Sequence, residues 1–179
     1  MYFQNIEFFE TDKFQYLLIH KNGSSSVRKC IENFHITDNI NFNKIRWTVI
    51  RDPYERFISG LKYDLTNQGL ELKDINQDDL YQCLINVRTR GSGNVNHVAS
   101  QVSYLINTNI NWYVDLKDLS VFLKMHFNKV EHENVSKKLV ELDIDKQEVM
   151  KHLQLDYHVY NNIKNSPSLW KWQNGNILC

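Results

Sequence analysis

Two stretches of the chain place an apolar run directly before a helical repeat, and this pattern restricts the fold more than any other feature. In residues 16–34 (YLLIHKNGSSSVRKCIENF), apolar residues recur at helical spacing at Val27, Ile31 and Phe34. In residues 44–65 (KIRWTVIRDPYERFISGLKYDL), a β-branched run precedes the same kind of repeat. Strands that alternate with helices favour a parallel sheet with helices on both sides.

The second helix carries a complete start signal. Asp52 can cap it, Pro53 suits the first helical position, and Glu55 stands where a capping box requires it. Arg56 follows Asp52 at a spacing that allows the two side chains to pair. Gly60 lowers the helix propensity without breaking the helix. One apolar stripe is formed by Tyr54, Ile58, Leu61 and Leu65.

The remaining segments complete one α/β domain, which we expect to span residues 1–179. Residues 2–20 are typical of an N-terminal hairpin of two strands, and residues 110–116 (INWYVDL) of a further strand. The last residues, 168–179, either cover the functional site or fray. The expected fold is a central, mainly parallel sheet flanked by helices. Helices are predicted over residues 24–34, 78–87, 119–127, 146–155 and 156–163.

Composition excludes several classes of protein. Hydrophobic residues make up 42% and charged residues 23%, as in ordinary globular domains. A formal net charge of +0 lacks the positive field that nucleic-acid or membrane-surface binding requires, so any anion site must be local. The three cysteines, Cys30, Cys83 and Cys179, suggest neither a disulfide framework nor a zinc site. Without a signal-peptide pattern or a long apolar run, we expect a soluble cytoplasmic protein.

The segment that follows the first central strand, HKNGSSSV, has the properties of an anion site. The backbone N–H groups of Gly23 to Ser26 lie at a predicted helix start, where unpaired donors and the positive end of the dipole attract an anion. Lys21 adds a full charge. In the P-loop of ATP and GTP enzymes the lysine follows the last glycine, whereas Lys21 precedes Gly23. No acidic residue at a strand end is suited to Mg²⁺, because Asp52 is committed to capping, so we expect a metal-free reaction.

The second segment, VIRDPYERFISG, supplies another anion site at the neighbouring strand end. Arg51 ends the strand and Ser59 lies in the following helix, so both can converge on one anion. The alternative for Arg51 is a surface ion pair with Asp52 or Glu55. Two anion sites at adjacent strand ends indicate one ligand that carries two phosphates.

Together these segments resemble the sulfotransferases that use 3′-phosphoadenosine 5′-phosphosulfate, and in particular the carbohydrate-sulfotransferase branch. Further motifs follow in the family's order: NHVASQVSYL, YVDLKDLSVFLKMHF, HENVS and LDYHVYNNI. The resemblance implies a P-loop NTPase-like fold and an enzyme that transfers a sulfuryl group to a hydroxyl acceptor, with adenosine 3′,5′-bisphosphate as the product. It implies a 5′-phosphosulfate site made by residues of the first loop and a 3′-phosphate site made by Arg51 and Ser59. The residues assigned to the first site are Lys21, Asn22, Gly23, Ser24, Ser25 and Ser26.

The catalytic candidates are Lys21, which would stabilise charge on the leaving oxygen, and His97, which would act as general base. His20 stands where the family usually has proline and is an alternative base. Gln101 and Asn134 are candidates for contacts to the donor or the acceptor. The acceptor itself stays open, with a glycan or a small alcohol among the candidates. The competing hypotheses are a P-loop-type nucleotide or small-molecule kinase and a catalytically inactive nucleotide-binding module.

Overall fold

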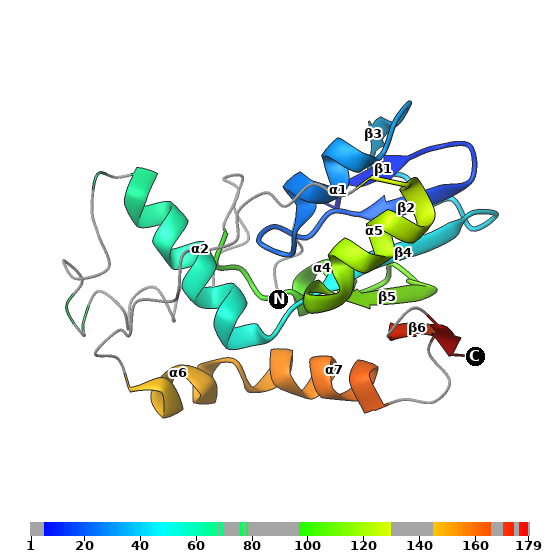
Figure 1. Ribbon diagram of the computed structural model, residues 1–179. Coiled ribbons are helices and arrows are strands. Elements are labelled where there is room, and N and C mark those ends of the chain that lie inside the picture. The colour runs from blue at the N-terminus through cyan, green and yellow to red at the C-terminus, as the bar shows by residue number, and fades with distance from the viewer. Residues whose placement is uncertain are drawn as a thin grey trace.

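The computed structural model describes residues 6–67, 69, 76, 78, 97–129 and 145–165, together with the backbone of residues 170–173 and 176–178. These residues form a single α/β domain with one sheet in the strand order β3-β1-β2-β4-β5-β6-β7 (Figure 1). The strands are β1 (Phe8–Glu10), β2 (Phe14–Leu17), β3 (His35–Thr37), β4 (Ile45–Ile50), β5 (Trp112–Asp115), β6 (Trp170–Gln173) and β7 (Asn176–Leu178). The helices are α1 (Ser24–Cys30), α2 (Pro53–Asn67), α4 (Val102–Leu105), α5 (Leu119–Phe127), α6 (Lys146–His152) and α7 (Gln154–Asn165), with a 3₁₀ turn, η2 (Leu116–Asp118).

The sheet is mixed, and its parallel strands lie in the middle. β2, β4, β5 and β6 are parallel neighbours, whereas β1, β3 and β7 pair antiparallel at the two ends of the sheet. The antiparallel pair β1–β2 confirms the predicted N-terminal hairpin. The C-terminal tail adds β6 and β7 next to β5, a role that the sequence did not predict.

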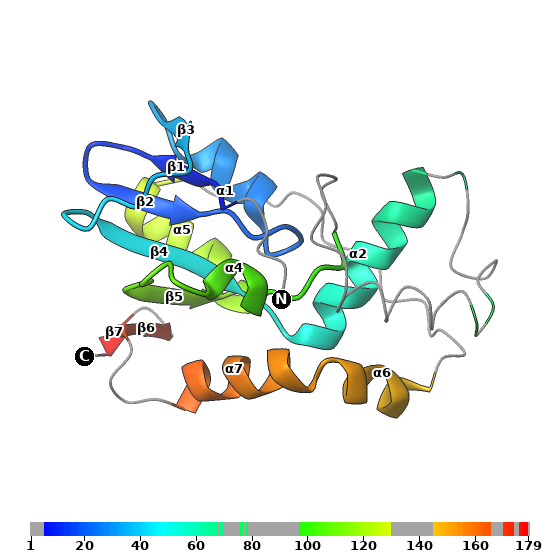
Figure 2. The same cartoon turned by 180° about the vertical axis from the view of Figure 1, so that it is seen from behind.

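Helices cover both faces of the sheet, as expected for strands that alternate with helices. One face packs against α1 and α5 through Tyr16, Trp47 and Val114 among others. The opposite face receives Ile110, α4 and α7, so that the sheet lies between two helical layers (Figure 2). Neighbouring residues of one strand point to opposite faces, since Phe8 and Phe9 belong to different clusters.

Helix α2 begins where β4 ends and reaches away from the sheet, and α6 and α7 run below the sheet and α2 in the view of Figure 1. The predicted cap of α2 is confirmed, because Asp52 Oδ1 accepts from the backbone N–H of Glu55 at 3.1 Å. The apolar stripe of α2 is buried against Val98 and against α6 and the α6–α7 junction. The residues of this cluster are Phe57, Ile58, Leu61, Leu65, Val98, Val149 and Leu153.

The predicted bounds of several helices differ from the structure or lie outside the residues that it describes. Helix α1 ends at Cys30, because Ile31 adopts an extended conformation (φ −86°, ψ 123°) and the chain turns towards β3. The helices predicted over residues 146–155 and 156–163 are α6 and α7, but α6 ends at His152 and α7 begins at Gln154, so the division falls two to three residues earlier than predicted. The helix predicted over residues 78–87 falls, apart from residue 78, outside the described residues.

Within the described part of the chain, no helix has the length and apolar character needed to cross a bilayer.

Candidate functional site

The two segments that the sequence predicts to bind anions lie side by side at the carboxyl ends of β2 and β4. Leu17 of β2 pairs with Thr48 of β4 in parallel register, so the loop after β2 and the start of α2 emerge at the same edge. Residues 97–101, which precede α4, pack against both. In parallel α/β sheets this edge is where ligands bind.

The loop after β2 has an unusual backbone. Lys21 has a φ of 65° and Gly23 a φ of 77°, both in the left-handed region. At Gly23 a Cβ would also lie 2.5 Å from Leu119 Cδ2 and 2.8 Å from Leu116 Cδ1, so glycine is required there by conformation and by packing. A lysine in the left-handed region costs conformational energy, and such residues cluster at functional sites.

Two buried amides hold this loop in place. Asn22, with no exposed surface, donates from Nδ2 to the carbonyl of Val49 at 2.7 Å and to Gln101 Oε1 at 3.3 Å. Gln101 in turn donates from Nε2 to the carbonyl of Arg51 at 2.9 Å. The side chains of Asn22 and Gln101 therefore tie the two strand-end loops together beneath the surface. Gln101, which the sequence suggested as a ligand contact, is buried in this role.

Arg51 joins the two segments directly. Its Nη1 donates to the backbone carbonyl of Lys21 at 3.1 Å, and its Nε lies 3.6 Å from Glu55 Oε2. The ion pair considered as an alternative for Arg51 is thus present, alongside the contact with the loop. Ser59 is half-buried further along α2. The bond from Arg51 to the Lys21 carbonyl brings the two segments predicted to bind phosphates into one cationic region.

Arg56 adds a third cation to the same region and, unlike the half-buried Lys21 and Arg51, is buried. The sequence suggested Asp52 as its partner, but its guanidinium instead donates to the carbonyls of His20, at 3.1 Å, and Ala99. This is possible because Arg56 points from α2 towards the segment 97–101, whereas Asp52 caps the helix and accepts from Tyr157. Among the described residues, the buried Nε of Arg51 and Nη2 of Arg56 have no hydrogen-bond partner.

Burial and neighbouring cations shift the pKa values of side chains in this region. Burial lowers the pKa of Lys21, and the neighbouring Arg51 and Arg56 lower it further. Burial also lowers the pKa of His20 to about 4, with contributions from His97, Arg56 and Lys21. Because Arg51 and Arg56 lower the pKa of Lys21, its ammonium lies in a positive potential, which a bound anion would relieve.

His97 lies next to this cationic region and contacts α2. Its Nδ1 is 2.7 Å from Asp64 Oδ1, and its ring centre is 4.3 Å from that of Tyr63 and 5.4 Å from that of His20. The ammonium of Lys21 lies 4.2 Å from the centre of the Tyr63 ring. Tyr63 therefore contacts both residues that the sequence nominated for catalysis.

Asp64 and Tyr63 were not predicted from the sequence. Helical periodicity could have shown that these two residues lie near the site. They follow Arg56 and Gly60 at spacings that place all four on one side of the helix, since Gly60 is four residues after Arg56, and Tyr63 and Asp64 are three and four residues after Gly60. They share a face of α2 away from its apolar stripe, but the partner of that face was not evident from sequence.

Gly60 lets the His97 segment approach this face. A Cβ at Gly60 would lie 2.3 Å from the carbonyl oxygen of His97, a distance that no side chain tolerates. Gly60 lowers the helix propensity of α2, but glycine is required at this position by the close contact with the backbone of His97.

The three serines begin α1 at different depths. Ser24 is half-buried, Ser25 exposed and Ser26 buried. The cap residue is Gly23, which accepts the first helical bond from Val27 N at 3.1 Å and offers no side-chain cap. The N–H groups of the first turn have no partner within the helix. Asn134 and the HENVS segment lie outside the described residues.

Comparison of the chain with protein-family models, curated proteins and solved structures found no match. The function has to be inferred from the geometry and charge of this site.

Proposed function

We propose that this protein is a sulfotransferase that transfers a sulfuryl group from 3′-phosphoadenosine 5′-phosphosulfate to a hydroxyl acceptor, on a P-loop NTPase-like fold. The observation that carries the proposal is the meeting of Lys21, Arg51 and Arg56 at the carboxyl ends of β2 and β4, beside a histidine paired with a carboxylate. Such a site suits a polyanionic donor and a reaction that requires a base.

The burial of the cations supports an anionic ligand. The pKa values of Lys21, Arg51 and Arg56 are all lowered, although Asp64, Glu55 and Asp156 respectively act to raise them. Burial is the largest cause in each case. Buried guanidinium donors without hydrogen-bond partners can be satisfied by phosphate oxygens, which accept from the fork of an arginine.

One set of residues would bind the sulfuryl donor, and a separate residue would act as the base. Lys21 and the N–H groups of Gly23 to Ser26 would neutralise charge on the leaving oxygen, while Arg51 and Ser59 would bind the 3′-phosphate. The donor supplies a sulfuryl group attached to a stable leaving group, adenosine 3′,5′-bisphosphate. His97 would accept the proton of the attacking hydroxyl. The hydroxyl oxygen then bonds to sulfur as the bond between sulfur and the bridging oxygen breaks.

The carboxylates at the strand ends favour this function over a Mg²⁺-dependent kinase. Asp52, after β4, accepts from the N–H of Glu55 and from the hydroxyl of Tyr157. Asp115, at the end of β5, accepts from the hydroxyl of Tyr160 at 3.1 Å. Both carboxylates have structural partners that hold helices in place, and Lys21 precedes its glycine instead of following it.

Calorimetry on the full chain tests the proposal. Adenosine 3′,5′-bisphosphate should bind without metal, and Lys21→Ala should weaken this binding while the exposed Lys13→Ala, at the opposite end of β2, leaves it unchanged. Binding of ATP with Mg²⁺ but not of the bisphosphate would overturn the proposal and favour the kinase hypothesis. A screen for transfer of labelled sulfate from the donor to a panel of alcohols and oligosaccharides then identifies the acceptor. Binding without transfer to any acceptor would favour the inactive nucleotide-binding module.

A further inference from the structure

The contact between His97 and Asp64 has a chemical consequence beyond the presence of a histidine at the site. The two side chains come from segments 33 residues apart and meet with Nδ1 and Oδ1 at 2.7 Å. Both are partly shielded, with 16% of the His97 side chain and 31% of the Asp64 side chain exposed. The contact is thus specific in geometry and protected from full solvation.

The carboxylate determines which ring nitrogen carries the hydrogen. An ionised carboxylate only accepts hydrogen bonds, so Nδ1 of His97 must donate. In the neutral imidazole, Nε2 then keeps its lone pair. The arrangement leaves Nε2 as the nitrogen that can take a proton, a division of roles seen wherever a carboxylate orients a histidine.

The surroundings of His97 fix its ring as well as its tautomer. Tyr63 packs on the ring, and Gly60 allows the backbone of His97 to touch α2. His20 lies edge-on to His97 and is uncharged at neutral pH, because burial lowers its pKa to about 4. A charged group, the Lys21 ammonium, lies on the other neighbour of His97, the Tyr63 ring, at 4.2 Å from its centre.

We propose that Asp64 is a positioning residue that holds His97 in the Nδ1–H tautomer, with Nε2 directed to the proton of the acceptor hydroxyl. This inference rests on the proposed transferase function. In the transfer step the hydroxyl proton moves to Nε2, the hydroxyl oxygen bonds to sulfur, and the electron pair of the broken sulfur–oxygen bond leaves with adenosine 3′,5′-bisphosphate. Asp64 touches none of the reacting atoms.

Nitrogen-15 NMR of the full chain tests the tautomer without any need for activity. At mildly alkaline pH, where an ordinary imidazole is neutral, the His97 signals, assigned with His97→Gln, should show a protonated Nδ1 and an unprotonated Nε2. Asp64→Asn should lose this signature. Asp38→Asn, the same change at an exposed carboxylate, should keep it. A wild-type protein in which Nε2 of His97 carries the hydrogen would overturn the proposal.

Kinetics separate this inference from the function on which it rests. Asp64→Asn should reduce kcat by about 10-fold or more, because the loss of a carboxylate that orients a catalytic histidine leaves the wrong tautomer, with adenosine 3′,5′-bisphosphate bound as in the wild type. Asp64→Glu should recover part of the rate. If the wild type transfers sulfate and Asp64→Asn is equally fast, the positioning role is wrong although the function holds. If the Nδ1–H tautomer is present but no acceptor is sulfated, the proposed function fails while the orientation of His97 by Asp64 stands.

Discussion

Arg51 donates a hydrogen bond from Nη1 to the backbone carbonyl of Lys21 at 3.1 Å. This bond joins the two strand-end segments, which lie 30 residues apart in the chain. It also holds Lys21 in a left-handed conformation, with its ammonium on the ring of Tyr63. The cation that the proposed mechanism needs at the leaving group is therefore positioned by a second cation that would bind the same donor.

Substitution of Lys21 should separate function from stability. Lys21→Ala and Lys21→Gly both remove the ammonium, so we expect both to abolish sulfate transfer. Because residue 21 has a φ of 65°, Lys21→Gly should be the more stable of the two, by about 1 kcal/mol. Urea unfolding measures the difference. Equal stability of the two variants would mean that the loop does not hold this conformation in solution, and wild-type transfer by either would remove Lys21 from the mechanism.

Arg51→Lys should weaken binding of the 3′-phosphate selectively. Lysine keeps the charge but loses the forked donor and the bond to the carbonyl of Lys21. We expect adenosine 3′,5′-bisphosphate to bind about 10- to 100-fold more weakly, as for the loss of a hydrogen bond to a charged group. Adenosine 5′-phosphate, which lacks the 3′-phosphate, should be affected much less. Calorimetry with both nucleotides checks this, and an equal loss for both would place Arg51 at the 5′ end of the donor.

His97→Ala should cut turnover by about 100-fold or more, the usual scale for loss of a general base. Binding of adenosine 3′,5′-bisphosphate should stay close to that of the wild type. His20→Ala is the comparison, since the two rings are neighbours and His20 was the alternative base. Single-turnover kinetics distinguish the two histidines. A larger rate loss in His20→Ala than in His97→Ala would reverse the assignment.

Gly60→Ala should destabilise the protein although alanine favours helices by about 1 kcal/mol relative to glycine. The new Cβ would lie 2.3 Å from the carbonyl oxygen of His97, so the segment 97–98 must move away from α2. We expect a net loss of about 1–3 kcal/mol, the scale of overpacking in a rigid site. Thr66→Ala, at an exposed position of the same helix, should leave stability nearly unchanged. Thermal unfolding of both variants measures the difference, and a stabilised Gly60→Ala would show that the contact is absent.

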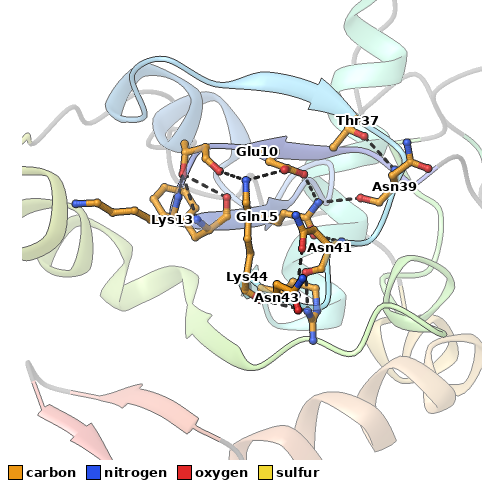
Figure 3. A network of polar contacts seen from close by, with 11 residues as sticks. Glu10, Lys13, Gln15, Thr37, Asn39, Asn41, Asn43 and Lys44 are labelled. Atoms are coloured by element: carbon orange, nitrogen blue, oxygen red, sulfur yellow. Dashed lines mark hydrogen bonds and ion pairs between the residues drawn. The ribbon is translucent and has the colours of Figure 1, made fainter.

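Acid should remove a stabilising interaction at the opposite end of the sheet. A polar network joins Glu10, Gln15, Asn39, Asn41 and Lys44 (Figure 3). The Lys44 ammonium, 2.7 Å from Glu10 Oε1, lowers the pKa of this carboxyl when the protein is folded.

A carboxyl whose folded pKa is lowered contributes stability above its unfolded pKa and loses it as pH falls through the folded pKa. We therefore expect the wild type to be more stable than Glu10→Gln at neutral pH, with the difference shrinking below about pH 4. Urea unfolding at a series of pH values tests this. Glu32→Gln, which breaks an ion pair between exposed side chains, should show a smaller dependence. A constant difference between wild type and Glu10→Gln would contradict the assignment.

Local patterns in the sequence were sufficient for much of the fold. The hairpin β1–β2, the strand β4 with its capped helix α2, and the pair β5–α5 follow from apolar periodicity and cap residues within short windows. The C-terminal strands β6 and β7 did not follow, because their place in the sheet depends on pairing with β5, distant in the chain.

The candidate site divides in the same way. From sequence alone, Lys21, Gly23 and Arg51 could be nominated, because each stands in a short motif whose residue types bind anions, and His97 was nominated through the resemblance of its segment to a known family. Tertiary structure decided their partners: Arg51 contacts the Lys21 loop, and Gln101 hydrogen bonds Asn22 across 79 residues of chain. The pairing of His97 with Asp64 is of the same kind, since it requires the packing of a loop on a helix face. Short motifs determine which chemical groups the chain possesses, but hydrogen bonds between remote segments determine which of them meet, because those bonds form only once the sheet and α2 have brought the segments together.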